Sequence, residues 1–207
     1  MRPAEPNAAV NPESAHDDTD SLLPRARDGE ALAFAGLVRR HQASVYSIGY
    51  RMLGRRDAAE DLAQDVFLQL YRKLDSIESS EHLGFWLRRV ASNLAIDRLR
   101  RAPYIETYTP DVAMLEAVAA PESHETADDH LMTRALAKLL GELPPAPRAV
   151  MVLRYQEDRD VADIAATLDM PVNTVKSHIK RSLTALRGKL VGAQLLTAEN
   201  LFEEEGP

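Results

Sequence analysis

Two blocks of helical apolar periodicity, separated by an acidic stretch punctuated by prolines, constrain the fold of this chain most strongly. In the first block, apolar residues recur every three or four positions from Phe34 to Met52 and again from Ala58 to Leu74. The pattern resumes near Asp128. This spacing places apolar side chains on one face of a helix, whereas a strand would need strict alternation. Aromatic residues are only 5% of the chain, which also suits packed helices. The predicted fold class is all-α.

The stretch between the blocks is predicted to be a flexible linker. Pro103, Pro110 and Pro121 interrupt it, and from Ala102 to Thr133 there are seven acids and no Lys or Arg. We therefore expect two small helical domains joined by an acidic tether. The predicted divisions are a disordered arm at 1–21, a first domain at 22–102, the linker at 103–127, a second domain at 128–190 and an acidic tail at 191–207.

Charge is unevenly distributed along the chain, whose net charge is −7. The segment Arg88–Arg101 has five arginines and one acid, and Met170–Leu190 has five Lys or Arg and no acid. Two basic islands in an acidic chain predict local contacts to phosphates with weak non-specific affinity. A protein built in this way would need a partner to bind DNA well.

Several classes of protein are disfavoured by composition. The absence of cysteine excludes disulfides and thiolate nucleophiles. No apolar run approaches the ~20 residues that span a bilayer, and the N-terminal residues lack the apolar segment of a signal peptide. The six histidines are scattered, and His124 and His130, near Asp128 and Asp129, come nearest to a metal-binding group. We expect a cytoplasmic protein that is not an enzyme, with no cofactor, no metal and no membrane insertion.

The segment ADIAATLDMPVNTVKSHIKRSLTAL has the spacing of a helix-turn-helix. Asp160 is placed to cap the first helix and Asn173 the second, and Pro171 prevents one continuous helix. The second helix is expected to present cations and a hydroxyl group to the base edges and phosphates of DNA. These residues are Lys176, Ser177, Lys180 and Arg181. The alternative is a helical hairpin with a solvated basic face.

The helix predicted to open at Asp57, with Glu60 completing a capping box, has a polar ridge. Positions i, i+3, i+4 and i+7 on this ridge are Asp61, Gln64, Asp65 and Leu68. Two acids with Glu60 beside them as a third, an amide and an exposed leucine would suit docking against a basic helical surface. An ordinary solvated face is the alternative.

The next predicted helix, from about Phe85 to Arg101, combines aromatic side chains with arginines and amides. An unpaired nucleic-acid strand needs these groups for stacking, base-edge contacts and phosphate neutralisation. The alternative is that Phe85 and Trp86 pack into the domain.

The order of these motifs resembles the extracytoplasmic-function sigma factors of the sigma-70 family. The segments GEALAFAGLVRRHQASVYSIGYRMLGRRDAAEDLAQDVFLQLYRKL and FWLRRVASNLAIDRLRR resemble domain two of that family. The segment LPPAPRAVMVLRYQEDRDVADIAATLDMPVNTVKSHIKRSLTALRGKL resembles domain four. The resemblance implies a subunit that binds core RNA polymerase, directs promoter recognition and allows transcription to start.

The resemblance also implies three groups of functional residues. The core-binding motif, which docks on the β′ clamp helices of the polymerase, corresponds to Glu60, Asp61, Gln64, Asp65, Phe67 and Leu68. Binding of the minus-ten element, with a flipped base held by the loop 77–84, is implied for Ser79, Ser80, Glu81, His82, Trp86, Arg89, Asn93, Asp97, Arg98 and Arg101. Binding of the minus-thirty-five element is implied for Asn173, Thr174, Lys176, Ser177, His178, Lys180 and Arg181.

The implied partners are the polymerase, through its β′ clamp helices and β subunit, promoter DNA, and an anti-sigma protein wedged between the two domains. Some positions depart from the family pattern. His178 replaces a common arginine, and Ser182-Leu183 stands where Ala-Arg is frequent, which weakens contacts to the DNA backbone. The loop residues from Ser79 to His82 differ from related loops and leave the recognised base open.

Two rival functions are compatible with parts of the sequence. A stand-alone helix-turn-helix regulator would bind duplex operators as a dimer without polymerase. A small nuclease would need clustered carboxylates for metal ions, for which the acids from Asp57 to Asp65 are the candidates.

Overall fold

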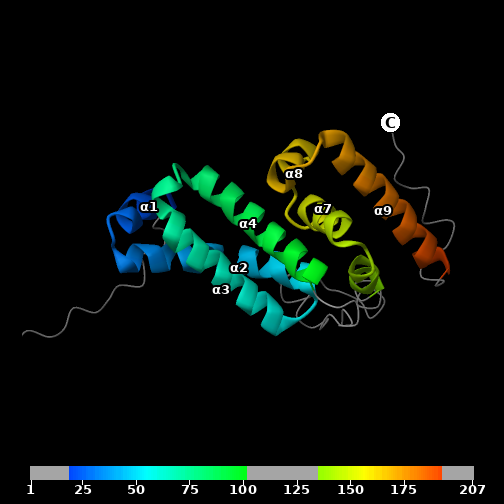
Figure 1. The fold of residues 1–207 in the computed structure, drawn as a ribbon, viewed down its shortest axis with the longest axis horizontal. Coiled ribbons are helices and arrows are strands. Elements are labelled where there is room, and N and C mark those ends of the chain that lie inside the picture. Colours follow the sequence, from blue (N-terminus) through cyan, green and yellow to red (C-terminus); the bar gives the residue numbers. More distant parts are fainter. Residues whose placement is uncertain (1–18, 102–134, 193–207) are drawn as a thin grey trace, which may run out of the picture.

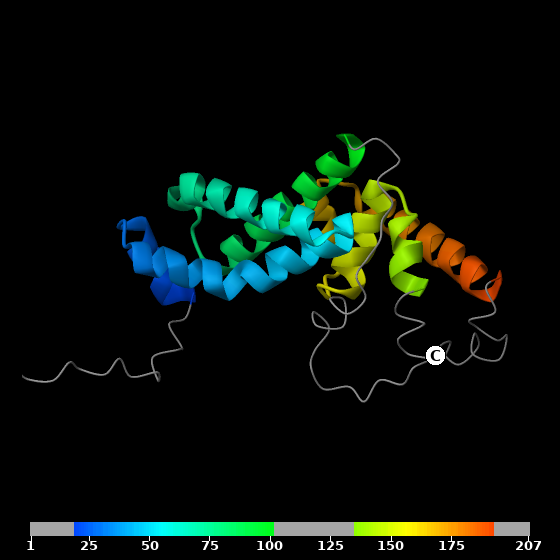
Figure 2. The same ribbon diagram turned by 90° about the horizontal axis from the view of Figure 1, so that it is seen from below.

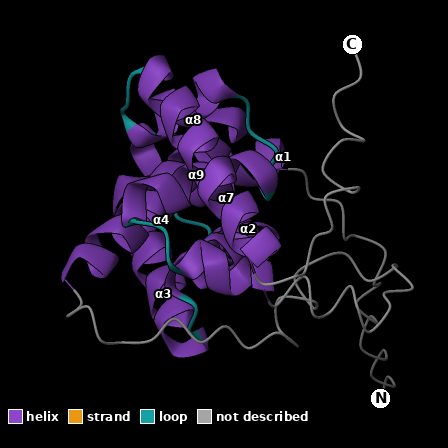
Figure 3. Ribbon diagram, turned by 90° about the vertical axis from the view of Figure 1, so that its right-hand side faces the viewer, coloured by secondary structure: helices purple, strands orange, loops and turns teal. Residues whose placement is uncertain are grey.

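The computed structural model describes residues 19–101 and 135–192, and every regular element in these ranges is a helix (Figure 3). The elements are α1 (Thr19–Arg27), α2 (Ala31–Leu53), α3 (Arg56–Lys73), a 3-10 turn η1 (Leu74–Ser76), α4 (Ser80–Arg101), helical residues 135–141, α7 (Pro145–Tyr155), α8 (Val161–Leu168) and α9 (Val172–Gly192). The predicted all-α fold is confirmed. None of the described helices has the length and apolar character needed to cross a membrane. The predicted linker at 103–127 lies outside the described residues.

Helix α2 is the centre of the N-terminal unit, which consists of α1 to α4 (Figure 1). It packs against α1, α3 and α4, and its far end also contacts α7. The predicted apolar stripe is its buried face, with Leu37, Val45, Ile48 and Met52 almost wholly covered. A Cβ atom added at Gly49 would lie 3.4 Å from the Ala59 Cα atom of α3, so the two helices cross closely at this point.

Two helix ends form as the sequence predicts. Gly54 ends α2 in the left-handed conformation, with φ 71°, and its N–H donates to the Tyr50 carbonyl at 2.7 Å. At the start of α8 the Asp160 carboxylate accepts a hydrogen bond from the Asp163 N–H at 2.8 Å. These contacts satisfy backbone groups that a helix leaves without partners at its ends.

Other helix starts differ from the predictions. Helix α3 begins at Arg56, and the carboxylates expected to form its capping box are held by arginines instead: Asp57 by Arg55 and Glu60 by Arg56. Helix α9 begins at Val172, so Asn173 lies in the first turn and is not its cap. The helix begins earlier because the Thr174 and Val175 N–H groups donate to the Pro171 carbonyl and not to the Asn173 side chain.

Two helices are longer than predicted. Helix α1 begins at Thr19, within the expected arm 1–21, because Thr19, Leu22 and Leu23 are buried in the N-terminal unit. Helix α4 begins at Ser80 and not near Phe85, so most of the expected loop 77–84 belongs to its first turns.

The C-terminal unit consists of residues 135–141 and α7 to α9, and it lies against the N-terminal unit (Figures 1 and 2). Helix α7 contacts α2 and α4, and α8 contacts α4. Helix α9 packs on α7 and α8 at the side remote from the N-terminal unit. The second helix of the helix-turn-helix therefore lies at the periphery.

Substitution of two glycines, one at the end of α2 and one inside α9, tests the described end of α2. Gly54→Ala should lower the free energy of unfolding by about 1 kcal/mol, because alanine is strained at positive φ. Gly188→Ala should raise it by about 0.5 kcal/mol, because Gly188 lies inside α9 and an added Cβ meets no atom within 4 Å. Thermal unfolding followed by circular dichroism measures both changes. Equal effects of the two substitutions would contradict the described end of α2.

Candidate nucleic-acid and protein interfaces

The outer face of α3 forms an acidic ridge, made of Glu60, Asp61, Gln64, Asp65 and Leu68, all of which are exposed. The buried side of the same helix, which includes Leu62, Val66 and Leu70, fixes this orientation. Phe67 is half-buried behind the ridge and packs against the core. The helical period thus brings together the residues predicted to form the core-binding motif.

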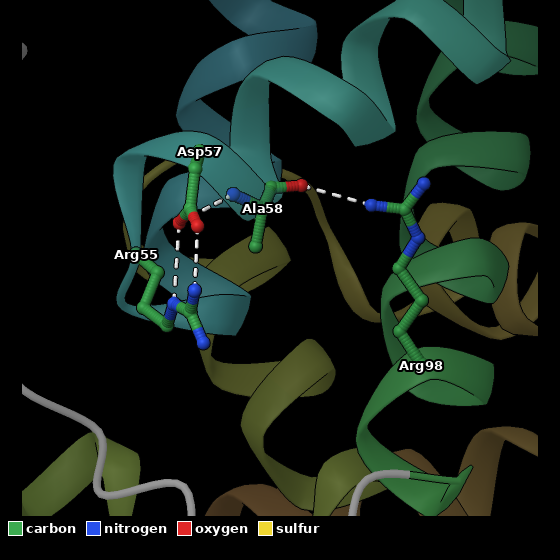
Figure 4. Close-up of polar contacts among 4 residues, drawn as sticks. All are labelled: Arg55, Asp57, Ala58 and Arg98. Carbon is green, nitrogen blue, oxygen red and sulfur yellow. Dashed lines mark hydrogen bonds and ion pairs between the residues drawn. The ribbon is translucent and has the colours of Figure 1, made fainter.

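Arginines neutralise most acids of this helix. Arg55 binds Asp57 with an N–O distance of 2.5 Å and lowers the pKa of that carboxyl, and the Asp57 carboxylate also accepts from the Ala58 N–H (Figure 4). Glu60 pairs with Arg56 at 2.9 Å, and Asp65 pairs with an arginine of α4 at 2.5 Å. Asp61 has no ion pair with any residue in the described ranges. Its charge is available to a partner.

An apolar groove of about 590 Å³ runs beside the acidic ridge, between α2 and α3. Leu68 and Tyr71 are 55% and 67% exposed, which is high for large apolar side chains. The Tyr71 ring lies edge-on to Phe34, with ring centroids 5.3 Å apart. The lining residues are Phe34, Val38, Gln42, Ala63, Gln64, Phe67, Leu68 and Tyr71.

Sequence reasoning missed this groove because it assigned Phe34, Val38 and Tyr71 to buried stripes. A stripe of helical period does not distinguish the centre of an interface from its edge. The available signal was the position of Tyr71, three residues after the exposed Leu68 and therefore on the same side of α3.

A second hollow, of about 470 Å³, lies along the outer face of α4. It brings together half of the residues expected to bind the minus-ten element, and its lining includes Trp86, which is half-buried and packs against the core. Trp86 therefore packs against the domain core and also lines the hollow, and its contact with nucleic acid stays a prediction. The lining residues are Gln69, His82, Phe85, Trp86, Arg89, Val90, Asn93, Leu94 and Asp97. Gln69, from α3, was not predicted.

The short segment before α4 is held by a reciprocal pair of hydrogen bonds. Ser79 Oγ accepts from the His82 N–H at 3.1 Å, and His82 Nδ1 accepts from the Glu78 N–H at 3.2 Å. Because Nδ1 is an acceptor, the ring proton is on Nε2, and the imidazole has a donor to offer at the hollow. Ser80 and Glu81 are in the first turn of α4, outside the lining of the hollow.

Arg98 joins the two helices of this region and does not face the hollow. Its Nη1 donates to the Ala58 carbonyl at 2.9 Å (Figure 4). Its Nη2 donates to Asp65 at 2.5 Å. Arg101 is exposed at the end of α4, and Asp97 faces Arg100 at 3.9 Å. The structure therefore places Arg98 outside the lining of the hollow, as it does Ser79, Ser80, Glu81 and Arg101.

The outer face of α9 carries the residues expected to contact the minus-thirty-five element. Asn173, Lys176, Ser177, Lys180 and Arg181 are exposed, whereas Thr174 and His178 are half-buried. Ser177 Oγ donates to the Asn173 carbonyl at 2.8 Å. Val175, Leu186 and Leu190 are buried on the opposite face, as the apolar stripe predicts. The helix has no acid, so this face is positively charged along its length.

The acids from Asp57 to Asp65 do not form a metal-binding group in the part of the chain that the structure describes. The described residues contain no group of three metal-ligating side chains. Three of these four acids, all but Asp61, are paired with different arginines, at Arg55, Arg56 and Arg98. His124 and His130 lie outside the described residues.

The Arg98 contacts yield a prediction about stability. Arg98→Ala should lower the free energy of unfolding by about 1 kcal/mol in the absence of DNA, because two hydrogen bonds between α3 and α4 are lost and both are partly screened by solvent. Arg101→Ala removes the same charge from an exposed position and should change it little. Chemical denaturation measures both. Equal stability of the two variants would exclude a structural role for Arg98.

Comparisons with known proteins agree with this arrangement. Residues 37–103 match the model of the family Sigma-70 region 2, and residues 133–186 match that of Sigma-70, region 4. The ECF RNA polymerase sigma factor SigW of Bacillus subtilis is 34% identical over 182 residues, covering 81% of this chain and 94% of SigW.

Solved structures show the same fold. The structure of CnrH in complex with the cytosolic domain of CnrY aligns with a TM-score of 0.62 and 24% identity, over 84% of this chain and 99% of CnrH. The sigma factor RpoE of Bartonella quintana, in complex with the anti-sigma factor NepR, aligns with a TM-score of 0.57 and 21% identity, over 76% of this chain and 96% of RpoE.

Proposed function

The chain belongs to the extracytoplasmic-function sigma factors of the sigma-70 family, and we propose that it binds core RNA polymerase and directs it to promoters. The observation that carries this proposal is the separation of three surfaces. The acidic ridge with its apolar groove, the hollow on α4 and the basic face of α9 are three distinct outward surfaces with different residues. A protein that joins an enzyme to two DNA elements needs such surfaces at once.

The acidic ridge and the groove form the docking surface for polymerase. Asp61 supplies an unneutralised charge, and Leu68 and Tyr71 supply exposed apolar surface beside it. Charge would guide the approach of a basic helical partner, and burial of the apolar side chains would stabilise the complex. The β′ clamp helices of the polymerase are the proposed partner.

The two remaining surfaces contact promoter DNA. The face of α9 with Lys176 and Lys180 enters the major groove of duplex DNA at the minus-thirty-five element. The hollow on α4 holds unpaired bases of the minus-ten element by stacking on Trp86 and by hydrogen bonds from Asn93 and Arg89. His82 Nε2 supplies a donor there, which favours a base that presents an acceptor.

This function needs no catalytic residue in the chain, and we propose none. A protein inhibitor is a further proposed partner, because RpoE of Bartonella quintana binds the anti-sigma factor NepR. The alternative function, a stand-alone helix-turn-helix regulator, accounts for α9 but leaves the acidic ridge, the groove and the hollow without a role. The other alternative, a nuclease, would need a metal-binding group, and none is found among the described residues.

Transcription in vitro with purified core polymerase and a promoter library tests the proposal. We expect transcripts from a defined subset of promoters only when the chain is present. Tight binding of the free chain to duplex promoters, with no effect on polymerase, would favour the stand-alone regulator instead.

The docking surface yields a matched pair of variants. Asp61→Arg should weaken binding to core polymerase about tenfold or more, because it places a cation against a basic partner surface. Asp75→Arg makes the same charge change at an exposed position outside the ridge and should bind normally. Competition with a labelled wild-type chain measures both affinities. Equal affinities would remove the acidic ridge from the docking surface.

The recognition face yields another pair. Lys176→Ala with Lys180→Ala should reduce transcription from promoters that depend on the minus-thirty-five element about tenfold and lower the salt dependence of promoter binding, because phosphate and base contacts are lost. Arg187→Ala, further along α9 and also exposed, should have a smaller effect. Transcription assays at several salt concentrations distinguish them. A larger effect of Arg187→Ala would move the DNA contact to the end of α9.

A further inference from the structure

One ion pair joins the acidic ridge to the helix that carries the hollow. Arg98 of α4 donates through Nη2 to the Asp65 carboxylate of α3 at 2.5 Å. Asp65 belongs to the acidic ridge, and most of the hollow is lined by α4. This pair, here called the Asp65–Arg98 bridge, therefore connects a protein-docking surface with a surface for unpaired DNA.

The bridge lies one helical turn beyond the lining of the hollow on both helices. Leu94 of α4 lines the hollow, and Arg98 follows it by four residues on the same side of that helix. Gln69 of α3 also lines the hollow, and Asp65 precedes it by four residues. A nucleic-acid strand that leaves the hollow at this end would pass directly beside Arg98.

Arg98 is held by two contacts that differ in exposure. Its Nη1 donates to the Ala58 carbonyl at 2.9 Å in a partly buried hydrogen bond (Figure 4). The bridge itself is open to solvent, since the Arg98 and Asp65 side chains are 30% and 53% exposed. Exposed ion pairs add little net stability, because water solvates both groups when they part. Asp65 can therefore exchange its cation, while the Ala58 contact keeps the guanidinium near the hollow.

Each surface loses one charge to the other in the bridge. Asp65 neutralises Arg98, so the guanidinium has no net charge to offer a phosphate, and Asp65 in turn has none to offer a basic partner. A cation of a docked protein competes with Arg98 for the same carboxylate. The guanidinium is then left uncompensated at the end of the hollow, where a phosphate can bind it. By thermodynamic reciprocity, a phosphate bound to Arg98 equally frees Asp65 for the partner.

We propose that Arg98 couples the two surfaces: docking of polymerase on Asp65 releases Arg98, which then binds the backbone of the unpaired strand held in the hollow. The identity of the docking partner rests on the proposed function. The exchange of Arg98 between Asp65 and a phosphate is a property of the chain alone and is measured without polymerase.

Binding of a single strand by the free chain tests the exchange. The probe is labelled oligodeoxythymidine, and its affinity is measured by fluorescence anisotropy at several salt concentrations. Asp65→Asn removes the charge that holds Arg98, so the affinity should rise about threefold over the wild type. The plot of log affinity against log salt concentration should steepen by about 0.7, the value for one additional phosphate contact on a single strand.

Asp57→Asn is the matched control. Asp57 is an exposed acid of the same helix and is also paired with an arginine at 2.5 Å. It points toward Arg55 and not toward Arg98 (Figure 4). The substitution makes the same change in net charge, but neither Arg55 nor any residue within one helical turn of it lines the hollow. It should raise the affinity less than Asp65→Asn and leave the salt dependence unchanged.

Arg98→Ala completes a double-mutant cycle. Alone, it should leave the salt dependence of the free chain unchanged, because the charge that it removes contacts no phosphate while Asp65 holds it. Combined with Asp65→Asn, it should return the salt dependence to the wild-type value and remove the gain in affinity over Asp57→Asn. Circular dichroism checks that each variant keeps its helix content.

Core polymerase tests the release by docking. In the complex with core, Arg98→Ala should reduce the yield of open promoter complexes about threefold, because one phosphate contact is lost. Arg98→Lys should restore most of this yield. Lysine keeps the charge but cannot form both hydrogen bonds that arginine makes to Ala58 and Asp65, so a purely structural role would not be restored.

Equal affinities and salt dependences of Asp65→Asn and Asp57→Asn would overturn the exchange, as would a steeper salt dependence that persists after Arg98→Ala. Failure of Arg98→Lys to restore open complexes would contradict the release by docking. The single-strand measurements omit polymerase, so their failure leaves the proposed function intact. A chain that shows the exchange but does not alter transcription by core polymerase would overturn the proposed function instead.

Discussion

Burial of α2 against its neighbours is the constraint on which the rest of the structure depends. Its 23 residues contact α1, α3, α4 and α7, so one helix sets the positions of the docking surface, the hollow and the C-terminal unit. Close packing leaves little freedom at these contacts. Near the C-terminal end of the same helix, the Met52 carbonyl accepts a hydrogen bond from Arg148 of α7 at 2.7 Å. One helix therefore determines the relative positions of surfaces that have separate chemical roles.

Charge in this molecule is divided between cations with internal partners and cations that face solvent. Arg55, Arg56 and Arg98 neutralise acids of α3 and shape the N-terminal unit. Lys176 and Lys180 lie on the exterior of a helix without acids. The overall charge of −7 opposes non-specific contact with DNA, while the face of α9 remains locally positive. Affinity for DNA is thus confined to local basic surfaces such as the face of α9, which a partner protein can position on DNA.

Local features were accessible from the sequence. The period of the apolar residues gave the helices and the exposed ridge, and the left-handed Gly54 and the Asp160 cap formed as expected. Helix starts were less accessible, since Arg55 and Arg56 compete for the carboxylates that would have capped α3.

Contacts between distant segments leave no periodic signal. Arg148 and Met52 are 96 positions apart, and the acidic, proline-containing stretch between them suggested independent units. The groove beside the acidic ridge escaped prediction for the same reason, because it needs the relative placement of two helices. In this structure α7 and α8 contact α2 and α4 in the position, between the units, where an inhibitor was expected to be wedged.

The close crossing at Gly49 connects the interior of the protein with a surface that another protein contacts. A side chain at this position would meet Ala59 and Leu62 and push α3 outward. The acidic ridge and one wall of the groove would move with that helix, although none of their own residues had changed. A buried residue without a side chain therefore contributes to the position of an external binding surface that lies on another helix.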